Sequence, residues 1–148
     1  MAGARGKLSD GNLALLLITL LYSDYKIEGR KRFQKIVCIL KHQYNIPFNY
    51  EFIPYFYGPY SEDLANSLNI LVSAGLVEER KIIVSDMFFQ YIYELTSEGK
   101  ELATSLTKKF KNINSSVIDR ISQEVTNLKS TDTVDLVKHS KVVSGMYE

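Results

Sequence analysis

The sequence is poor in cysteine, tryptophan and proline, with one, none and three of these residues among its 148. The single cysteine, Cys38, excludes an intrachain disulfide and a zinc site built from several cysteines, and it fits the reducing conditions of the cytoplasm. A glycine-rich phosphate loop, an HExxH motif and a CxxC pair are also missing. We therefore expect a cytoplasmic, non-enzymatic protein without catalytic residues, metal or cofactor.

The chain also lacks an excess of charge of one sign. Its formal net charge is +1, which favours no class of partner. Hydrophobic residues make up 45% of the chain and charged residues 24%, as in ordinary globular domains. A chain of this length can bury a core without disulfides, so we expect one domain that carries a helical extension.

A long hydrophobic run is absent as well. Residues 13–21 (LALLLITLL) are apolar and follow Arg5 and Lys7, a combination that resembles a signal peptide. The run is, however, shorter than the roughly 20 residues that span a membrane. Residues 10–12 (DGN) separate it from the basic residues, and no cleavage site of small residues follows it. The run therefore predicts a buried helix, capped by the Asp or Asn of that segment, and no membrane partner.

The chain does contain a clear series of secondary-structure signals. Leucines recur at helical spacing, Ser61 stands before two acidic residues as a helix cap, and Gly75 is placed to end that helix. Two β-rich segments flank Ser85–Met87. We expect helices over residues 11–23, 29–44, 62–74, 97–110, 117–128 and 134–143, and strands over residues 76–84 and 88–95.

Helix, hairpin and helix in this order predict an α+β fold, a winged helix-turn-helix with a two-stranded β-hairpin as its wing. We expect this domain to span residues 10–111. A polar break at residues 112–116 separates it from a helical extension over residues 112–148. The apolar stripe from Ser116 onward predicts a homodimer interface, because winged-helix regulators usually bind two half-sites.

Charge is divided unevenly along the chain. Residues 1–48 carry eight Lys or Arg and three Asp or Glu, whereas residues 49–79 carry five Asp or Glu and neither Lys nor Arg. The basic residues of the helix at 29–44 form either a phosphate-contacting surface or an ordinary solvated face. With the hairpin, the candidate phosphate contacts are Arg30, Lys31, Lys35, Arg80 and Lys81.

The helix at 62–74 would read the bases in a winged helix. Its outward stripe is Glu62, Asn66, Asn69 and Ser73. Asn66 and Asn69 can pair with adenine in the major groove. DNA affinity, however, comes mainly from Lys and Arg, which this helix lacks. Glu62 and Asp63 would repel phosphates at the end that enters the groove, although the helix dipole also explains their position.

Residues 49–60 (NYEFIPYFYGPY) are rich in aromatic side chains. Pro54 makes a central strand unfavourable, so we expect an edge strand or an ordered loop. Packing against the neighbouring helices is the favoured role of these rings. Stacking on bases and binding to a protein partner are the alternatives.

Cys38 and His42 are four residues apart, on one side of a predicted helix. That spacing suits a Cys-His dyad or a pair of metal ligands. The favoured interpretation is a half-buried Cys38 beside the core and a solvated His42.

Three segments carry a resemblance to known families. KRFQKIV at residues 31–37, followed by YGPYSEDL at 57–64, resembles the YwgA-like and Panacea (SocA-like antitoxin) group over roughly residues 30–77. YELTSEG at 93–99 is similar to the strand-to-helix junction of PadR and MarR winged-helix regulators. The chain departs at Phe33, where leucine is usual. The resemblance implies a winged-helix-like fold in a regulatory or antitoxin setting, not an enzyme.

These features predict a DNA-binding transcriptional regulator whose partner is duplex DNA. The helix at residues 62–74 would supply base contacts through Asn66 and Asn69, and the basic residues named above would contact phosphates. The alternative is a protein-binding antitoxin or adaptor module on the same scaffold. Its contact residues would be Tyr57, Tyr60, Glu62 and Asp63.

Overall fold

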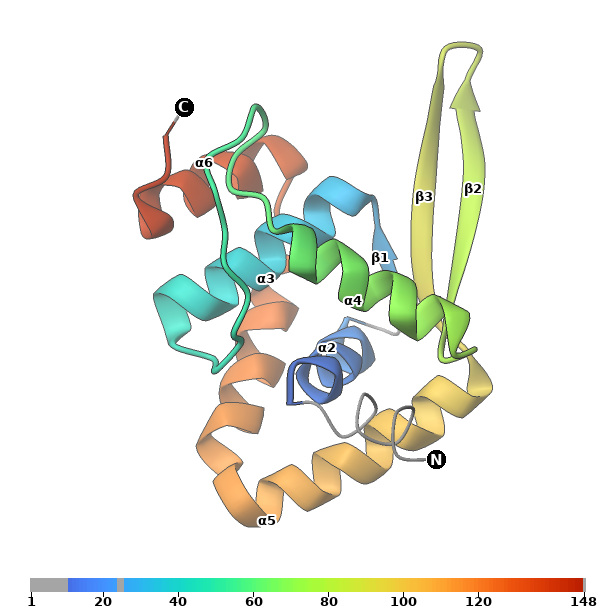
Figure 1. Ribbon diagram of the computed structural model, residues 1–148, viewed down its shortest axis with the longest axis vertical. Coiled ribbons are helices and arrows are strands. Elements are labelled where there is room, and N and C mark those ends of the chain that lie inside the picture. Colours follow the sequence, from blue (N-terminus) through green and yellow to red (C-terminus); the bar gives the residue numbers. More distant parts are fainter. Residues whose placement is uncertain (1–10, 24–25, 148) are drawn as a thin grey trace.

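The computed structural model describes residues 11–23 and 26–147 of the chain (Figure 1). The expected cap at Asp10 lies outside these residues. The elements in chain order are α2 (Gly11–Tyr22), β1 (Lys26–Glu28), α3 (Arg30–Tyr44), α4 (Glu62–Ser73), β2 (Val77–Ser85), β3 (Phe88–Leu95), α5 (Ser97–Leu128) and α6 (Thr133–Ser144). The predicted α+β class and the antiparallel hairpin are confirmed, and the arrangement is compatible with a winged helix.

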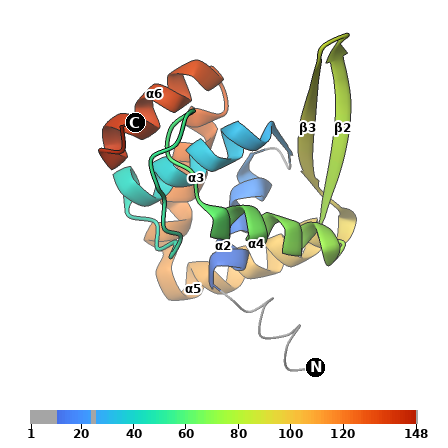
Figure 2. The same ribbon diagram turned by 45° about the horizontal axis from the view of Figure 1, so that its top comes forward.

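The sheet has one strand more than the predicted hairpin. Its order is β1-β3-β2, with both neighbouring pairs antiparallel. β1 pairs with only three residues of β3, Ile92–Glu94, whereas β2 accompanies β3 along its whole length. Among residues 11–23 and 26–147, no third strand pairs with the far half of the hairpin, which projects beyond the helical body (Figures 1 and 2).

The core surrounds α2, as its continuous apolar sequence predicts. Every residue from Leu13 to Leu20 is buried. The one polar residue among them, Thr19, donates a hydrogen bond from its hydroxyl to the carbonyl of Leu15 at 2.8 Å, so no donor is left unpaired. The helix packs against α5, α4 and β3, which enclose it (Figure 1).

Both ends of α4 follow the sequence signals. The hydroxyl of Ser61 accepts a hydrogen bond from the backbone N–H of Leu64 at 3.2 Å, which caps the helix start. Gly75 has a φ of 76°, a conformation that favours glycine. It allows the N–H of Leu76 to bond the carbonyl of Leu71 at 3.0 Å, which closes the helix end.

The junction from β3 to α5 depends on a close contact at Gly99. Thr96 caps the helix, because its hydroxyl accepts a hydrogen bond from the N–H of Gly99 at 3.0 Å. A Cβ atom built on Gly99 would lie 2.0 Å from the carbonyl oxygen of Leu76, at the start of the hairpin. Only glycine lets the helix approach the strand this closely. The LTSEG segment is thus a packing motif.

The predicted break within residues 112–116 is narrower than expected. α5 continues through this segment and is interrupted at Asn114 alone, whose φ and ψ are −151° and 81°. The amide oxygen of Asn114 accepts hydrogen bonds from the Ser116 hydroxyl at 2.8 Å and the Val117 N–H at 3.4 Å. It therefore acts as an internal cap, and α5 changes direction there (Figure 1).

The apolar stripe after Ser116 does not face outward. Ile118, Ile121 and Val125 are fully buried and belong to the same core cluster as α2 and α3. Leu136 of α6 is also fully buried in that cluster. These side chains of the stripe therefore belong to the chain's own core, and the homodimer stays a prediction.

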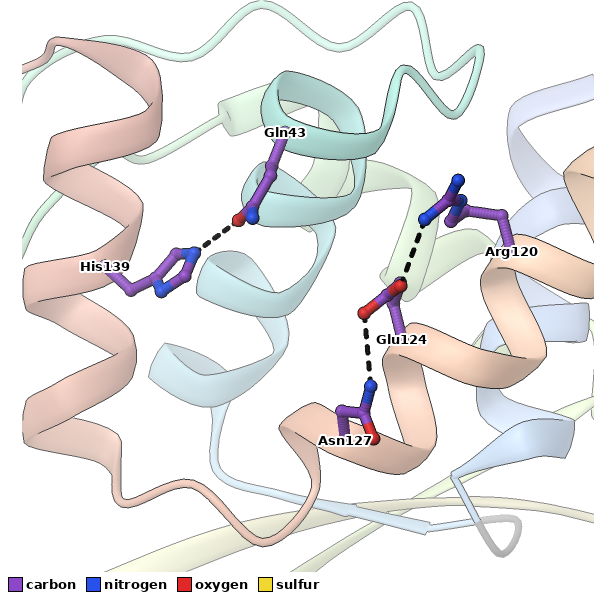
Figure 3. A network of polar contacts seen from close by, with 5 residues as sticks. All are labelled: Gln43, Arg120, Glu124, Asn127 and His139. Atoms are coloured by element: carbon purple, nitrogen blue, oxygen red, sulfur yellow. Dashed lines mark hydrogen bonds and ion pairs between the residues drawn. The ribbon is translucent and has the colours of Figure 1, made fainter.

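One polar contact joins α6 to α3, and a second group of polar contacts lies within α5 (Figure 3). His139 of α6 hydrogen bonds Gln43 at the end of α3. On α5, the buried carboxylate of Glu124 accepts hydrogen bonds from Arg120 and from Asn127, each at 3.3 Å. The guanidinium of Arg32 donates to the Leu128 carbonyl at 3.2 Å and to the Lys129 carbonyl at 3.1 Å, at the negative end of the α5 dipole.

Candidate functional site

Two of the three segments that carry the family resemblance are in contact. Gln34 of α3 forms two hydrogen bonds with the backbone of Ser61, one from each of its amide atoms, both 2.9 Å long. The next residue, Lys35, donates from Nζ to the carbonyl of Pro59 at 2.8 Å. The FQK segment of α3 thus holds the YGPYS loop by its backbone.

The loop itself is ordered by its own turn. Ile53 and Tyr60 exchange backbone hydrogen bonds of 2.9 Å, and the N–H of Gly58 bonds the carbonyl of Tyr55 at 3.0 Å. Gly58 has a φ of 93°, and a Cβ atom there would lie 3.2 Å from the Lys35 side chain and 3.3 Å from Ser140 of α6. Of the two predicted forms, the ordered loop is correct.

A pocket of about 400 Å³ opens between α3, this loop, α4 and the base of β3. Its floor includes Phe33 and Leu68, both buried core residues. Six of the lining residues are predicted from the sequence to contact either DNA or a protein partner. They are Arg30, Lys31, Lys35, Tyr57, Tyr60 and Asn69. The fold brings the candidate DNA contacts and the candidate protein contacts to one place.

Arg30 stands at the junction of the pocket and the sheet. Its Nε donates to the hydroxyl of Tyr93 at 2.9 Å, and that hydroxyl donates to Glu79 at 2.5 Å. The guanidinium carbon also lies 3.7 Å from the ring centroid of Tyr91. Burial, together with the hydrogen bond to Glu79, raises the pKa of Tyr93 to about 12, so the hydroxyl stays protonated and neutral.

Lys35 is not on the surface, although both interpretations of the basic residues of this helix place it there. The residue is only 3% exposed, and burial lowers the pKa of its ammonium group to about 8. The charges of Lys31 and Lys141 lower this pKa further, whereas the nearby Cys38 raises it. The ammonium of Lys35 is thus held inside the fold and is not presented at the surface.

The other predicted phosphate contacts differ in how far their charge is compensated. Arg80 lies between two carboxylates, 3.4 Å from Glu78 and 3.1 Å from Glu94. Lys31 and Lys81 are exposed, and each places its ammonium over an aromatic ring, 3.9 Å from the centroid of Tyr57 and 3.8 Å from that of Phe89. These two lysines keep charges that an external anion can approach.

The outward stripe of α4 is exposed, as predicted. Glu62, Asn66, Asn69 and Ser73 of this stripe all face solvent, as does the neighbouring Asp63. Asn69 additionally lines the pocket, whereas Asn66 does not. The two asparagines are therefore not equivalent, although the sequence treats them alike.

Exposed apolar side chains at the far end of the hairpin are the feature that sequence reasoning missed. Ile83, Met87 and Phe88 are 80%, 83% and 70% exposed. The signal was present in the sequence as two apolar triplets, IIV and MFF, on either side of the turn. In the loop of the pocket, Phe56 is similarly exposed at 75%.

The structure does not form a Cys-His dyad. Cys38 is fully buried instead of half-buried, and burial raises the pKa of its thiol to about 12. His42 packs edge-on against Phe52, with 5.9 Å between ring centroids, and its Nε2 is buried without a hydrogen-bond partner among the described residues.

Within residues 11–23 and 26–147 no group of three or more His, Cys, Asp or Glu side chains is arranged to hold a metal ion. No helix in this part of the chain is both long and apolar enough to cross a membrane.

Comparison with known proteins supports one part of the resemblance. The uncharacterized protein YwgA of Bacillus subtilis (strain 168) is 39% identical to this chain over 80 residues, which make up 53% of this chain and 47% of the relative. The chain thus spans about half the length of the curated relative that it matches. No protein-family model and no solved structure matches the chain. The likeness is to the YwgA-like group, and the name of this relative states no activity.

Proposed function

We propose that this chain is a cytoplasmic, non-enzymatic protein-binding module of the antitoxin or adaptor type, built on a winged-helix scaffold. The observation that carries the proposal is the hairpin tip, which we define as Ile83, Met87 and Phe88. These side chains are 70–83% exposed at the end of a projecting hairpin. Apolar side chains gathered on an exposed surface favour contact with a protein partner.

The charges of the hairpin support the same conclusion. A wing that grips DNA requires basic side chains that phosphates can neutralise. Here Arg80 is already compensated by Glu78 and Glu94 on its two sides. The turn carries Asp86 and no basic residue. A protein surface that is apolar and weakly charged suits this tip better than a phosphate backbone does.

The loop before α4 offers a second contact region. Tyr57 is 58% exposed, and Glu62 and Asp63 follow at the exposed start of α4. Aromatic rings next to carboxylates favour a partner with basic and aromatic side chains. This region contains the residues that the sequence assigned to the protein-binding alternative.

Photo-crosslinking in the native cells tests the proposal. A benzophenone amino acid would replace Phe88 at the tip and, as the matched control, Ile113, which is 72% exposed at the bend of α5. We expect a discrete adduct from position 88 that Ile83→Ser and Met87→Ser weaken. An adduct twice the mass of the chain would identify a homodimer. Equal labelling from both positions, or none from position 88, would contradict the proposal.

DNA binding is the second candidate, and the open face of α4 favours it. Asn66 and Asn69 are exposed there, and Lys31 and Lys81 present accessible charges. If α4 reads bases, Asn66→Ala with Asn69→Ala would reduce sequence discrimination by about 1–3 kcal/mol per lost bidentate contact. Gel shifts at low salt, with steep salt dependence, would detect the binding. A folded protein that shifts no duplex at low salt would eliminate this candidate.

A further inference from the structure

We propose that the pocket between α3, the YGPYS loop and α4 binds a small aromatic anion, a flat ring that carries a carboxylate or phosphate group. The inference does not depend on the hairpin tip, which carries the protein-binding proposal, although the pocket shares Tyr57 with the second contact region of that proposal. The volume of the pocket, about 400 Å³, lies in the range of small-molecule sites, roughly 300–1,000 Å³.

The charges around the pocket are all of one sign. Arg30, Lys31 and Lys35 line it, and no carboxylate does among the described residues. The chain as a whole is nearly balanced, with 18 basic and 17 acidic residues. Arg30 is paired with Glu79, whose carboxylate lies 3.7 Å from its guanidinium, so the charges left for a ligand are those of Lys31 and Lys35. Such a cavity attracts an anion and rejects a cation.

Lys35 supplies the strongest reason for an anionic ligand. Its side chain is 3% exposed, and its hydrogen bond goes to the neutral carbonyl of Pro59 at 2.8 Å. Within residues 11–23 and 26–147, no carboxylate lies within ion-pair distance of its Nζ. A buried ammonium without an opposite charge is costly, and a bound anion would offset that cost. The lowered pKa of Lys35, about 8, is consistent with this unfavourable environment.

The side chains that line the pocket favour a ligand with an aromatic ring. Tyr55 and Tyr60 lie with ring centroids 5.3 Å apart and planes tilted by 34°. The ring of Tyr57 lines the opening, where the ammonium of Lys31 already rests on it at 3.9 Å. Phe33 and Leu68 close the apolar floor. A flat ring among these side chains gains stacking and apolar burial that inorganic phosphate cannot gain.

Titration of the full chain with four probes tests the inference. The probes are 2-naphthoate, its uncharged isostere 2-naphthamide, 2-naphthyl phosphate and inorganic phosphate, followed by amide chemical shifts in NMR spectra. We expect saturable shifts at Gln34, Tyr57 and Asn69 with naphthoate or naphthyl phosphate. The amide and inorganic phosphate should bind at least about tenfold more weakly, because the amide lacks the negative charge and inorganic phosphate lacks the aromatic ring. The stronger of the two anions identifies the head group.

Substitutions of single lysines distinguish a specific binding site from nonspecific attraction of anions to positive charge. Lys31→Met should weaken naphthoate binding by about two- to fivefold, as expected for a partly exposed charge. Lys81→Met is the matched control, because Lys81 also rests on an aromatic ring but lies on the hairpin. Lys35→Met should weaken binding by about tenfold or more. Equal effects of Lys31→Met and Lys81→Met, equal affinity for naphthamide, or no saturable shift at millimolar naphthoate would each overturn the inference.

Discussion

Gln34 and Ser61 are joined by two reciprocal hydrogen bonds across 27 residues of sequence. The side-chain amide of Gln34 donates to the Ser61 carbonyl and accepts from the Ser61 N–H, both at 2.9 Å. Both residues are buried, at 5% and 1% exposure. The hydroxyl of the same serine caps α4. One glutamine of α3 therefore fixes the point where α4 begins, and with it one wall of the pocket.

Replacing Gln34 with alanine should lower the free energy of unfolding by about 1–3 kcal/mol. The change leaves the buried N–H of Ser61 without its partner, a loss that costs about 1–3 kcal/mol, whereas the Ser61 carbonyl keeps the hydrogen bond from the N–H of Ala65 at 3.2 Å. Urea unfolding monitored by circular dichroism measures the effect. The matched control is Gln123→Ala on the exposed side of α5, which should change stability by less than about 0.5 kcal/mol. Equal stability of the two variants would show that the pairing contributes nothing.

Replacing Gly99 with alanine should be strongly destabilising, by about 3 kcal/mol or more, although alanine is the better helix former. The new Cβ would lie 2.0 Å from the backbone oxygen of Leu76, which cannot move without disturbing the hairpin. Thermal unfolding would report the loss. Gly11→Ala provides the control, because Gly11 is also helical and a Cβ there meets nothing within 4 Å. If Gly99→Ala were as stable as Gly11→Ala, the close contact would not exist.

Local signals in the sequence were sufficient for most of the helices and the hairpin. Ser61 and Gly75 mark the ends of α4 because capping depends only on neighbouring residues. β1 could not be predicted, since three residues become a strand only by pairing with the end of β3. Its existence depends on a partner more than sixty residues away in the chain.

The pocket could not be predicted for a similar reason. Lysine is rarely buried, so the sequence predicts a surface position for Lys35 and its basic neighbours, either contacting phosphates or solvated. The carbonyl of Pro59 that receives its ammonium comes from a loop 24 residues away. Tyr57 and Asn69 were likewise separate candidates, and only the fold places them around one cavity. The residue types were visible in the sequence, whereas their proximity was not.

The thiol of Cys38 should be inert in the native protein. It is fully buried, and its pKa of about 12 leaves almost no thiolate at pH 8. A disulfide reagent such as Ellman's should therefore react only as fast as the protein opens, and completely in concentrated guanidinium. For comparison, Cys38→Ser combined with Ser73→Cys moves the thiol to an exposed position on α4, where it should react at once. Rapid labelling of native Cys38 would contradict its burial.

Lys35 should make stability rise with pH just above neutrality. Its folded pKa of about 8 lies below the usual 10.5, so the unfolded chain binds the proton more tightly. Stability linked to this group is therefore lowest below the folded pKa and increases as pH rises through it. Between about pH 7 and about pH 8.5 the gain should be roughly 0.8 kcal/mol.

Urea unfolding at these two pH values, compared with Lys35→Met, isolates the effect. The variant should lack the rise, because it has no proton to lose at this position. Cys38 acts in the opposite direction, since its raised pKa removes stability as pH climbs above its usual 9.0, and the window ends before that point. The charged neighbours Lys31 and Lys141 are present in both proteins. A bound naphthoate should flatten the rise in the wild type, because an anion beside Lys35 raises its pKa and keeps the ammonium protonated. An identical pH dependence in wild type and variant would show that Lys35 does not titrate here, and the buried-charge argument for the pocket would lose its support.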